Sequence, residues 1–148
     1  MSKIVVASGG FDPLHIGHIE YLEKAKQLGD KLIVILNSDE FLMKKKGFVF
    51  MKAEERKIII KNLRMVDLVV NCIDQDMTVC KTLSVIDPDI FAKGGDRTKD
   101  EIPERYICGL LGIEIVDGLG PKIRSSSELV DKMENRQLKI GKKESKNE

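Results

Sequence analysis

Histidine is scarce in this sequence, which has only His15 and His18 among its 148 residues. Tryptophan is absent, and aromatic residues make up 5% of the chain. The three cysteines (Cys72, Cys80 and Cys108) are odd in number and have no metal-like spacing, so we interpret them as reduced and mostly structural. No apolar run approaches the ~18 residues of a membrane-spanning helix. These absences exclude a disulfide scaffold, a cysteine-based metal site and a membrane-spanning protein.

An excess of charge of one sign is also lacking. The 25 basic and 24 acidic residues leave a net charge of +1, which argues against binding nucleic acid through one large basic face. We therefore expect no nucleic-acid partner and no membrane partner. The residues after Met1 lack the apolar segment and cleavage site of a signal peptide, which indicates a cytoplasmic protein. We expect one domain over residues 1–138 and a charged, disordered tail over residues 139–148.

What the sequence does contain is an alternation of two patterns. Short apolar, β-branched runs predict buried strands at residues 4–7, 32–36, 68–70, 90–92 and 113–116. Helical patterns lie at residues 18–28, 53–63, 78–85 and 103–111, and a last helix is expected to start at residues 125–127. This order predicts an α/β fold with a doubly wound, parallel, five-stranded sheet. In such sheets the ligand crevice lies beyond the carboxyl ends of the strands.

The segment GGFDPLHIGH, residues 9–18, directly follows the first predicted strand. It is neither a P-loop nor a dinucleotide fingerprint, because GxxxxGK[ST] and GxGxxG are both absent. Gly9 and Gly10 allow a ligand to approach the backbone, and a helix that starts here offers its N–H groups to a phosphate. His15 and His18 can lie on one face of the first turn and donate hydrogen bonds to a phosphoryl group during its transfer. The structural alternative is that one histidine caps the helix and the other packs against the sheet.

Other functions for the two histidines are less well supported. A zinc site would need a third protein ligand, and the sequence has no further histidine or suitably spaced cysteine. The HIGH tetrapeptide, residues 15–18, also occurs in class I aminoacyl-tRNA synthetases, but those enzymes are several times longer and "KIRSSS" at residues 122–127 departs from their KMSKS-type loop. A non-catalytic nucleotide-binding or regulatory protein on the same fold stays open as an alternative.

The segment also resembles the signature of the cytidylyltransferase-like nucleotidyltransferase superfamily. Members include glycerol-3-phosphate cytidylyltransferase and the adenylyltransferase domain of the bifunctional heptose-phosphate enzyme. The resemblance extends over residues 4 to about 133. Further blocks follow in the expected order: "LGDKLIVILNSDEF", "KKKG", "EERKIII", "VDLVV", "KGGD" and "SSSELVDKM".

The resemblance implies the same fold, a Rossmann-like nucleotidyltransferase fold, and a reaction in which a phosphate on an acceptor attacks the α-phosphorus of an NTP and releases pyrophosphate. Three groups of residues follow from it by position. The implied catalytic residues are His15, His18 and Lys46. The implied nucleotide-binding residues are Gly10, Phe11, Asp12, Lys93, Gly94, Asp96, Ser125, Ser126 and Ser127. The implied acceptor-binding residues are Lys44 and Arg56.

The nucleotide and the acceptor are less closely specified. Cytidylyltransferases of the family carry an RTxGIS-type segment before the last helix, whereas this chain has Gly120-Pro121 there, which favours ATP over CTP. The "DEF" and "EERKIII" blocks are more similar to the CTP-dependent glycerol-3-phosphate enzyme, which stays the alternative. The triphosphate requires Mg²⁺, held mainly by phosphates and water, and no metal site made of protein ligands is expected. We expect a small phosphorylated sugar, polyol, alcohol or cofactor as acceptor, and a homodimer.

Overall fold

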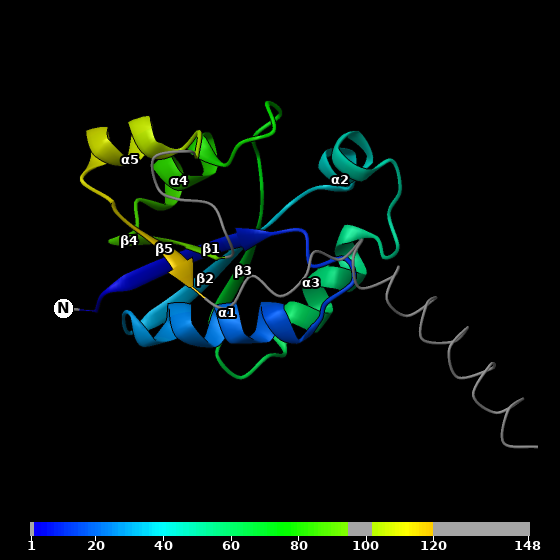
Figure 1. Cartoon of the computed structure of the whole chain (residues 1–148), viewed down its shortest axis with the longest axis horizontal. Coiled ribbons are helices and arrows are strands. Elements are labelled where there is room, and N and C mark those ends of the chain that lie inside the picture. Colours follow the sequence, from blue (N-terminus) through cyan, green and yellow to red (C-terminus); the bar gives the residue numbers. More distant parts are fainter. Residues whose placement is uncertain (1, 95–101, 120–148) are drawn as a thin grey trace, which may run out of the picture.

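The computed structural model describes residues 2–94 and 102–119, in which strands and helices alternate (Figure 1). The elements, in chain order, are β1 (Ile4–Gly9), α1 (Ile16–Gln27), β2 (Lys31–Leu36), α2 (Asp39–Lys46), α3 (Ala53–Lys61), β3 (Leu68–Asn71), α4 (Cys80–Ile86), β4 (Ile90–Gly94), α5 (Arg105–Leu111) and β5 (Glu114–Leu119). Within this part of the chain, no helix is long and apolar enough to cross a membrane.

The strands form one sheet in the order β3-β2-β1-β4-β5, and each neighbouring pair is parallel. The strand order reverses between β1 and β4, because the chain winds outward from β1 in one direction and from β4 in the other. The predicted doubly wound parallel sheet of five strands is therefore confirmed. The carboxyl ends of β1 and β4 flank the switch point, where ligands bind in folds of this type.

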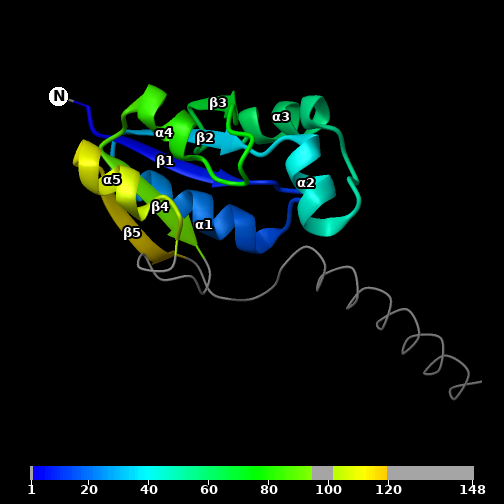
Figure 2. The same ribbon diagram turned by 90° about the horizontal axis from the view of Figure 1, so that it is seen from above.

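Helices cover both faces of the sheet: in Figure 1, α4 and α5 lie above the strands and α1 and α3 lie below them, and Figure 2 shows the same elements from above. On one face, α1 and α3 pack against the sheet around Val5, Leu22, Val34 and Ile60, which are at most 1% exposed. On the other face, α4 and α5 enclose a second cluster. Burial on both faces explains why the strands read as continuous apolar runs rather than as alternating ones.

The short helix α2 was not predicted from the sequence. Ser38 caps α2 by accepting the Phe41 N–H (3.0 Å), and Gly47 ends the helix in the left-handed conformation with φ of 83°. Acidic residues in the first turn and lysines in the last turn complete the usual start and stop signals of a helix. Those signals were present in the sequence, but Leu42 is the only buried residue of α2, so an apolar periodicity was absent.

The remaining boundaries lie close to those expected. Helix α1 starts at Ile16 with His15 as its N-cap, two residues earlier than predicted, and α5 starts at Arg105 rather than at Pro103. The helix expected from residues 125–127 and the tail at residues 139–148 lie outside the described residues.

Candidate active site

The two histidines cap the helix that follows β1. His15 is the N-cap of α1, and its Nδ1 accepts the Gly17 N–H (3.1 Å). In return, His18 Nδ1 accepts the His15 N–H (3.2 Å). This reciprocal arrangement is a capping box, which satisfies backbone donors at the start of a helix. One alternative from the sequence was that one histidine caps the helix; the structure shows that both histidines do so.

Capping orients both imidazoles for a second interaction. Because Nδ1 of each neutral ring accepts a backbone N–H, the ring proton must sit on Nε2. The rings of His15 and His18 stack with their centroids 3.8 Å apart, so the two Nε2–H groups belong to neighbouring, nearly parallel rings. Gly17 permits this arrangement, because a Cβ there would lie 3.0 Å from the His15 ring. The spacing of the motif therefore stacks two imidazole rings, each of which carries a donor on Nε2.

His18 is held in the neutral form. Burial, followed by the nearby His15 and the positive charge of Lys46, lowers the pKa of His18 to about 3. Its other neighbour is Phe11, whose ring meets the imidazole edge to face at a centroid distance of 5.0 Å. Phe11 is buried in the left-handed region with φ of 52°, a conformation that costs energy for a non-glycine residue. His18 is therefore a neutral donor at neutral pH rather than a cation.

Lys46 reaches the same loop from the last turn of α2. Its Nζ donates to the main-chain oxygen of Asp12 (2.6 Å) and lies 5.2 Å from the centroid of the Phe48 ring. Burial lowers the pKa of Lys46, an effect that the carboxylate of Asp12 opposes. The structure thus brings Lys46 into the electrostatic environment of His18. The catalytic roles of His15, His18 and Lys46 stay predictions.

Asp12 is buried, and both of its carboxylate oxygens face the connection between α2 and α3. Oδ2 accepts the Phe50 N–H and Oδ1 accepts the Met51 N–H, each at 2.8 Å. The side chain of Asp12 has no exposed surface. Gly10 lies on the same loop, and a Cβ there would meet Leu42 of α2 at 2.7 Å, so this glycine allows α2 to pack closely. Contacts of Gly10, Phe11 and Asp12 with a nucleotide stay predictions.

Arg56 is fully buried, and its guanidinium donates to four acceptors. Nε donates to the Met51 oxygen (2.8 Å), and Nη1 donates to the oxygens of Gly10 (2.9 Å) and Asn37 (2.8 Å). Nη2 forms an ion pair with Asp39 at 2.7 Å. Contact with an acceptor phosphate stays a prediction, and the structure adds a role within the fold that the sequence did not indicate.

Tyr21 is a residue of this region that the sequence analysis missed. Its buried hydroxyl donates to the Ala92 oxygen of β4 (2.6 Å) and accepts the Ser8 N–H of β1 (3.3 Å). The ladder between β1 and β4 ends at the pair Ala7 and Ala92, so Tyr21 bridges the two strands where they separate. A Cβ on Gly94 would lie 2.8 Å from the Tyr21 ring, which gives this predicted nucleotide-binding glycine a packing role as well. An aromatic residue on the apolar face of a helix gave no signal of this bridge.

The other predicted site residues are less directly connected to the histidines. Lys44 is exposed on the last turn of α2, and Lys93 lies on β4 with its Nζ 5.4 Å from the Phe91 ring. Asp96 and Ser125, Ser126 and Ser127 lie outside the described residues. Within residues 2–94 and 102–119, no group of three or more His, Cys, Asp or Glu side chains could hold a metal ion.

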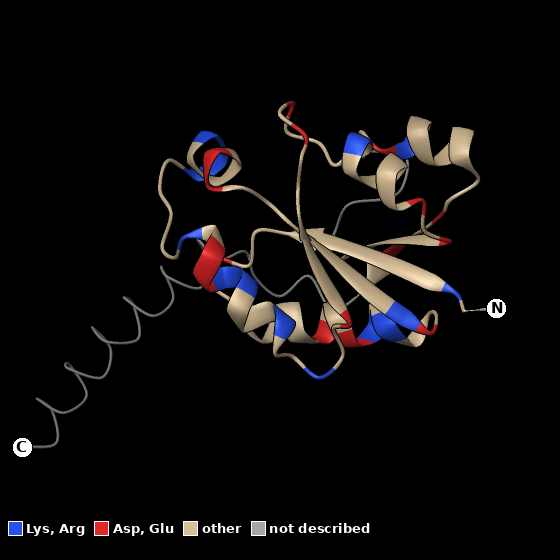
Figure 3. Cartoon of the chain, turned by 180° about the vertical axis from the view of Figure 1, so that it is seen from behind, with Lys and Arg blue, Asp and Glu red and all other residues tan. Residues whose placement is uncertain are grey.

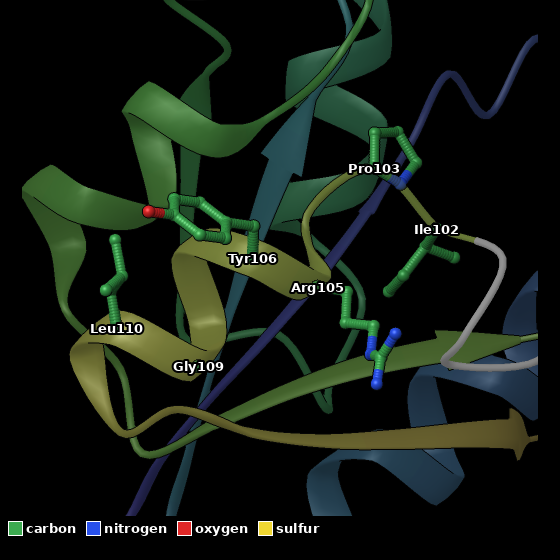
Figure 4. A pocket seen from close by; sticks show the side chains of 6 residues that line it. All are labelled: Ile102, Pro103, Arg105, Tyr106, Gly109 and Leu110. Carbon is green, nitrogen blue, oxygen red and sulfur yellow. The ribbon is translucent and has the colours of Figure 1, made fainter.

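The surroundings of the site carry mixed charge. Basic and acidic positions are interleaved along α1, α2 and α3 in Figure 3, where Lys and Arg are blue and Asp and Glu are red. A separate hollow of about 480 Å³ runs along α5, lined by Ile102, Pro103, Arg105, Tyr106, Gly109 and Leu110 (Figure 4). None of these lining residues is a predicted site residue. The candidate site is therefore the loop between β1 and α1 together with the end of α2.

The sequence is similar to known proteins over most of its length. The sequence model of the family described as cytidylyltransferase-like matches residues 6–139. The bifunctional protein HldE of Hahella chejuensis is 35% identical over 147 residues, which cover 93% of this chain and 29% of that protein. HldE of Wolinella succinogenes is 37% identical over 135 residues, which cover 89% of this chain and 27% of that protein. The chain thus spans less than a third of the length of these relatives.

Solved structures share the fold. A lipopolysaccharide core biosynthesis protein from Thermoplasma volcanium superimposes with a TM-score of 0.68 at 29% identity, covering 81% of this chain and 98% of that one. Pantoate-beta-alanine ligase from Francisella tularensis, solved with a β,γ-ATP compound and β-alanine, gives a TM-score of 0.54 at 21% identity and covers 85% of this chain and 61% of its own. The second likeness shows the fold alone.

Proposed function

Because the chain belongs to the cytidylyltransferase-like family, we propose that it transfers a nucleotidyl group from an NTP to a phosphorylated acceptor. A phosphate oxygen of the acceptor forms a bond to the α-phosphorus of the NTP. The bond between the α-phosphorus and the oxygen that bridges to the β-phosphorus breaks, and pyrophosphate leaves with the electron pair. Such a reaction needs positioning and charge stabilisation more than covalent participation by the protein.

One observation supports the proposal: the rings of His15 and His18 stack at the start of a helix, and Nδ1 of each ring accepts a backbone N–H, which leaves the ring proton on Nε2 as a donor. Negative charge accumulates on the phosphate oxygens in the transition state, and preorganised donors lower its energy. The helix N-terminus adds a partial positive charge in the same direction. Neutral histidines suit this role, because they donate without first having to gain a proton.

Lys46 supplies the positive charge of the site. Its ammonium lies at the same loop as the histidines, where it can meet phosphate oxygens of the nucleotide or the acceptor. We propose that Mg²⁺ arrives with the nucleotide as part of the substrate, coordinated by phosphate oxygens and water. We also propose that Lys44 contacts the acceptor. The nucleotide would be contacted by Lys93, Gly94, Asp96 and Ser125 to Ser127.

The acceptor that we favour is a sugar phosphate. The similarity to HldE proteins and to a lipopolysaccharide core biosynthesis protein supports this class, since lipopolysaccharide cores are built from sugars. We propose ATP as the nucleotide, because Gly120-Pro121 replaces the Arg-Thr pair of the cytidylyl branch. We further propose that the protein works as a homodimer, which light scattering of the purified chain would test.

Pyrophosphate release by the purified chain tests the proposed reaction. The assay combines ATP or CTP with Mg²⁺ and a panel of sugar, polyol and alcohol phosphates, and ³¹P NMR identifies the diphosphate product. We expect turnover that requires an acceptor, and a kcat/KM for ATP at least about tenfold above that for CTP, or ~1.4 kcal/mol. A preference for CTP would overturn the choice of nucleotide. Triphosphate binding without turnover on any acceptor would favour the non-catalytic alternative.

A further inference from the structure

We propose that Asp12 and Arg56 are positioning residues, which hold the segment after α2 against the histidine loop and thereby fix Lys46 at the site. This inference rests on the proposed function for its activity readout. It assigns to Asp12 and Arg56 a role other than direct contact with nucleotide or acceptor. The two side chains are 1% and 0% exposed as residues, and each joins parts of the chain that are far apart in sequence.

Asp12 acts on the connection between α2 and α3. Its two carboxylate oxygens accept the N–H groups of Phe50 and Met51, which lie 38 and 39 residues away in sequence. A carboxylate can accept from consecutive backbone N–H groups through both oxygens, and charge-assisted bonds of this kind are stronger than neutral ones. Both oxygens are engaged and the side chain has no exposed surface, so Asp12 offers no accessible carboxylate oxygen to a ligand.

Arg56 binds the same two segments, the histidine loop and the connection between α2 and α3, through its guanidinium group. Its planar fork joins Gly10 of the histidine loop, Asn37 at the end of β2, and Met51. Three backbone oxygens from three segments therefore converge on one side chain. Arginine suits this task because its donors are fixed in a plane, whereas lysine presents a single point charge.

Lys46 contacts Asp12 and lies in the electrostatic environment of Arg56. Its ammonium donates to the main-chain oxygen of Asp12 and is 3.9 Å from the Asp12 carboxylate. The chain that follows Lys46 turns at Gly47 and then passes through Phe48, whose ring lies against the ammonium, to the two N–H groups that Asp12 holds. The position of the ammonium relative to His18 is thus set by Asp12 directly and by Arg56 through Gly10 and Met51. A displacement of about 1 Å at a catalytic group can cost on the order of 100-fold in rate.

A double-mutant cycle between Asp12 and Lys46 tests the proposal. Asp12→Asn retains the shape of the side chain but turns an NH₂ group toward a backbone N–H, so the 50–51 segment must shift. We expect this variant to lower kcat/KM by at least about tenfold in the wild-type background and by less than about twofold when Lys46 is already replaced by Met. Equal losses in the two backgrounds would overturn the proposal, because Asp12 would then act on the substrate or on the fold as a whole. A loss of less than twofold in the wild-type background would overturn it too.

Arg56→Lys provides the second arm if Asp12→Asn does not fold, as judged by circular dichroism. It preserves the charge and removes the fork, and we expect the same dependence on Lys46. Asp89→Asn is the matched control, because Asp89 accepts the Ile4 N–H (2.8 Å) at the opposite edge of the sheet and should leave kcat/KM unchanged. If the wild-type chain has no transferase activity, the proposed function fails, and the same cycle is measured on the Kd of ATP. Coupling in Kd then supports the positioning role, and additive losses of affinity contradict it.

Discussion

Aspartate side chains accept backbone N–H groups at both ends of the parallel strands, but the two ends differ in how exposed these aspartates are. At the amino-terminal edge, Asp30 accepts the Lys3 N–H (2.6 Å) and Asp89 accepts the Ile4 N–H (2.8 Å), and both aspartates are exposed. Asp67 accepts the Leu32 N–H in the same way and pairs with a lysine. Water can replace any of these partners.

At the carboxyl-terminal ends of the strands, Asp12 and Arg56 are buried, and the side chain of Asp39, the ion-pair partner of Arg56, is 42% exposed. Asp12 accepts two N–H groups, and Arg56 donates to three carbonyl oxygens and to Asp39. Water has little access to replace a lost partner of Asp12 or Arg56, so a buried group that loses its hydrogen bond there destabilises the fold by the cost of its desolvation. The side-chain hydrogen bonds at the amino-terminal ends of the strands are exposed, and water can replace them. The bonds of Asp12 and Arg56, at the carboxyl-terminal ends where the candidate site lies, are buried, and water cannot easily replace them.

Arg56→Met should have the largest effect. It removes the donors of the carbonyl oxygens of Gly10, Asn37 and Met51, so we expect the free energy of unfolding to fall by about 3 kcal/mol or more. Urea denaturation followed by circular dichroism measures this change. A decrease in the free energy of unfolding of less than about 1 kcal/mol would mean that water replaces the lost partners at the carboxyl-terminal ends of the strands as it does at the amino-terminal ends. The contrast between the two ends would then fail.

Replacing the histidines should act on turnover instead. We expect His15→Ala and His18→Ala each to lower kcat by about 100-fold or more, or ~2.7 kcal/mol, because each removes an Nε2–H donor to transition-state charge. Steady-state pyrophosphate release measures kcat, and thermal melts verify that the variants are folded. Since loss of the cap also costs stability, a His15→Asn variant serves as a control that retains a capping side chain. Folded alanine variants with nearly wild-type kcat would contradict the assignment.

The pH dependence of stability should report the burial of His18. Its pKa is about 3 in the folded protein and near 6.5 when unfolded, so between these values the unfolded chain binds the additional proton. Stability from this group is complete above pH 6.5 and is lost as the pH falls toward 3, by at most about 1.4 kcal/mol per pH unit. Unfolding titrations at pH 7 and pH 5 would show it, and His18→Gln should reduce the difference. An identical difference in the variant would assign the pH dependence to other groups.

Asp89→Asn should have the smallest effect of the four. An exposed carboxylate that accepts one backbone N–H is replaced by an amide that can still accept it, so we expect less than about 1 kcal/mol in the free energy of unfolding. The measurement is the same urea titration that is used for Arg56→Met. If Asp89→Asn lowered the free energy of unfolding as much as Arg56→Met, the two ends of the strands would be equally sensitive to the loss of a hydrogen bond.

Much of the fold was predictable because its signals are local. The continuous apolar runs indicated buried parallel strands, and the glycines and histidines after the first run marked the loop at the switch point. The family resemblance rested on short ordered blocks, and the match over residues 6–139 confirms it. Helix α2 was missed because its evidence lies in its caps and charges rather than in an apolar face.

The sequence by itself determined the doubly wound sheet, the place of the candidate site, and the pairing of His15 with His18, since each depends on periodicity or on spacing within a few residues. Only the tertiary structure decided what Asp12, Tyr21 and Arg56 do. The side-chain hydrogen bonds of Asp12 and Tyr21 span 13 to 71 residues along the chain, and the four bonds of Arg56 span 5 to 46 residues. A buried arginine and an exposed one look alike in a sequence, because burial is a property of the packed chain. The partners that make such a charge tolerable are assembled only when the segments meet.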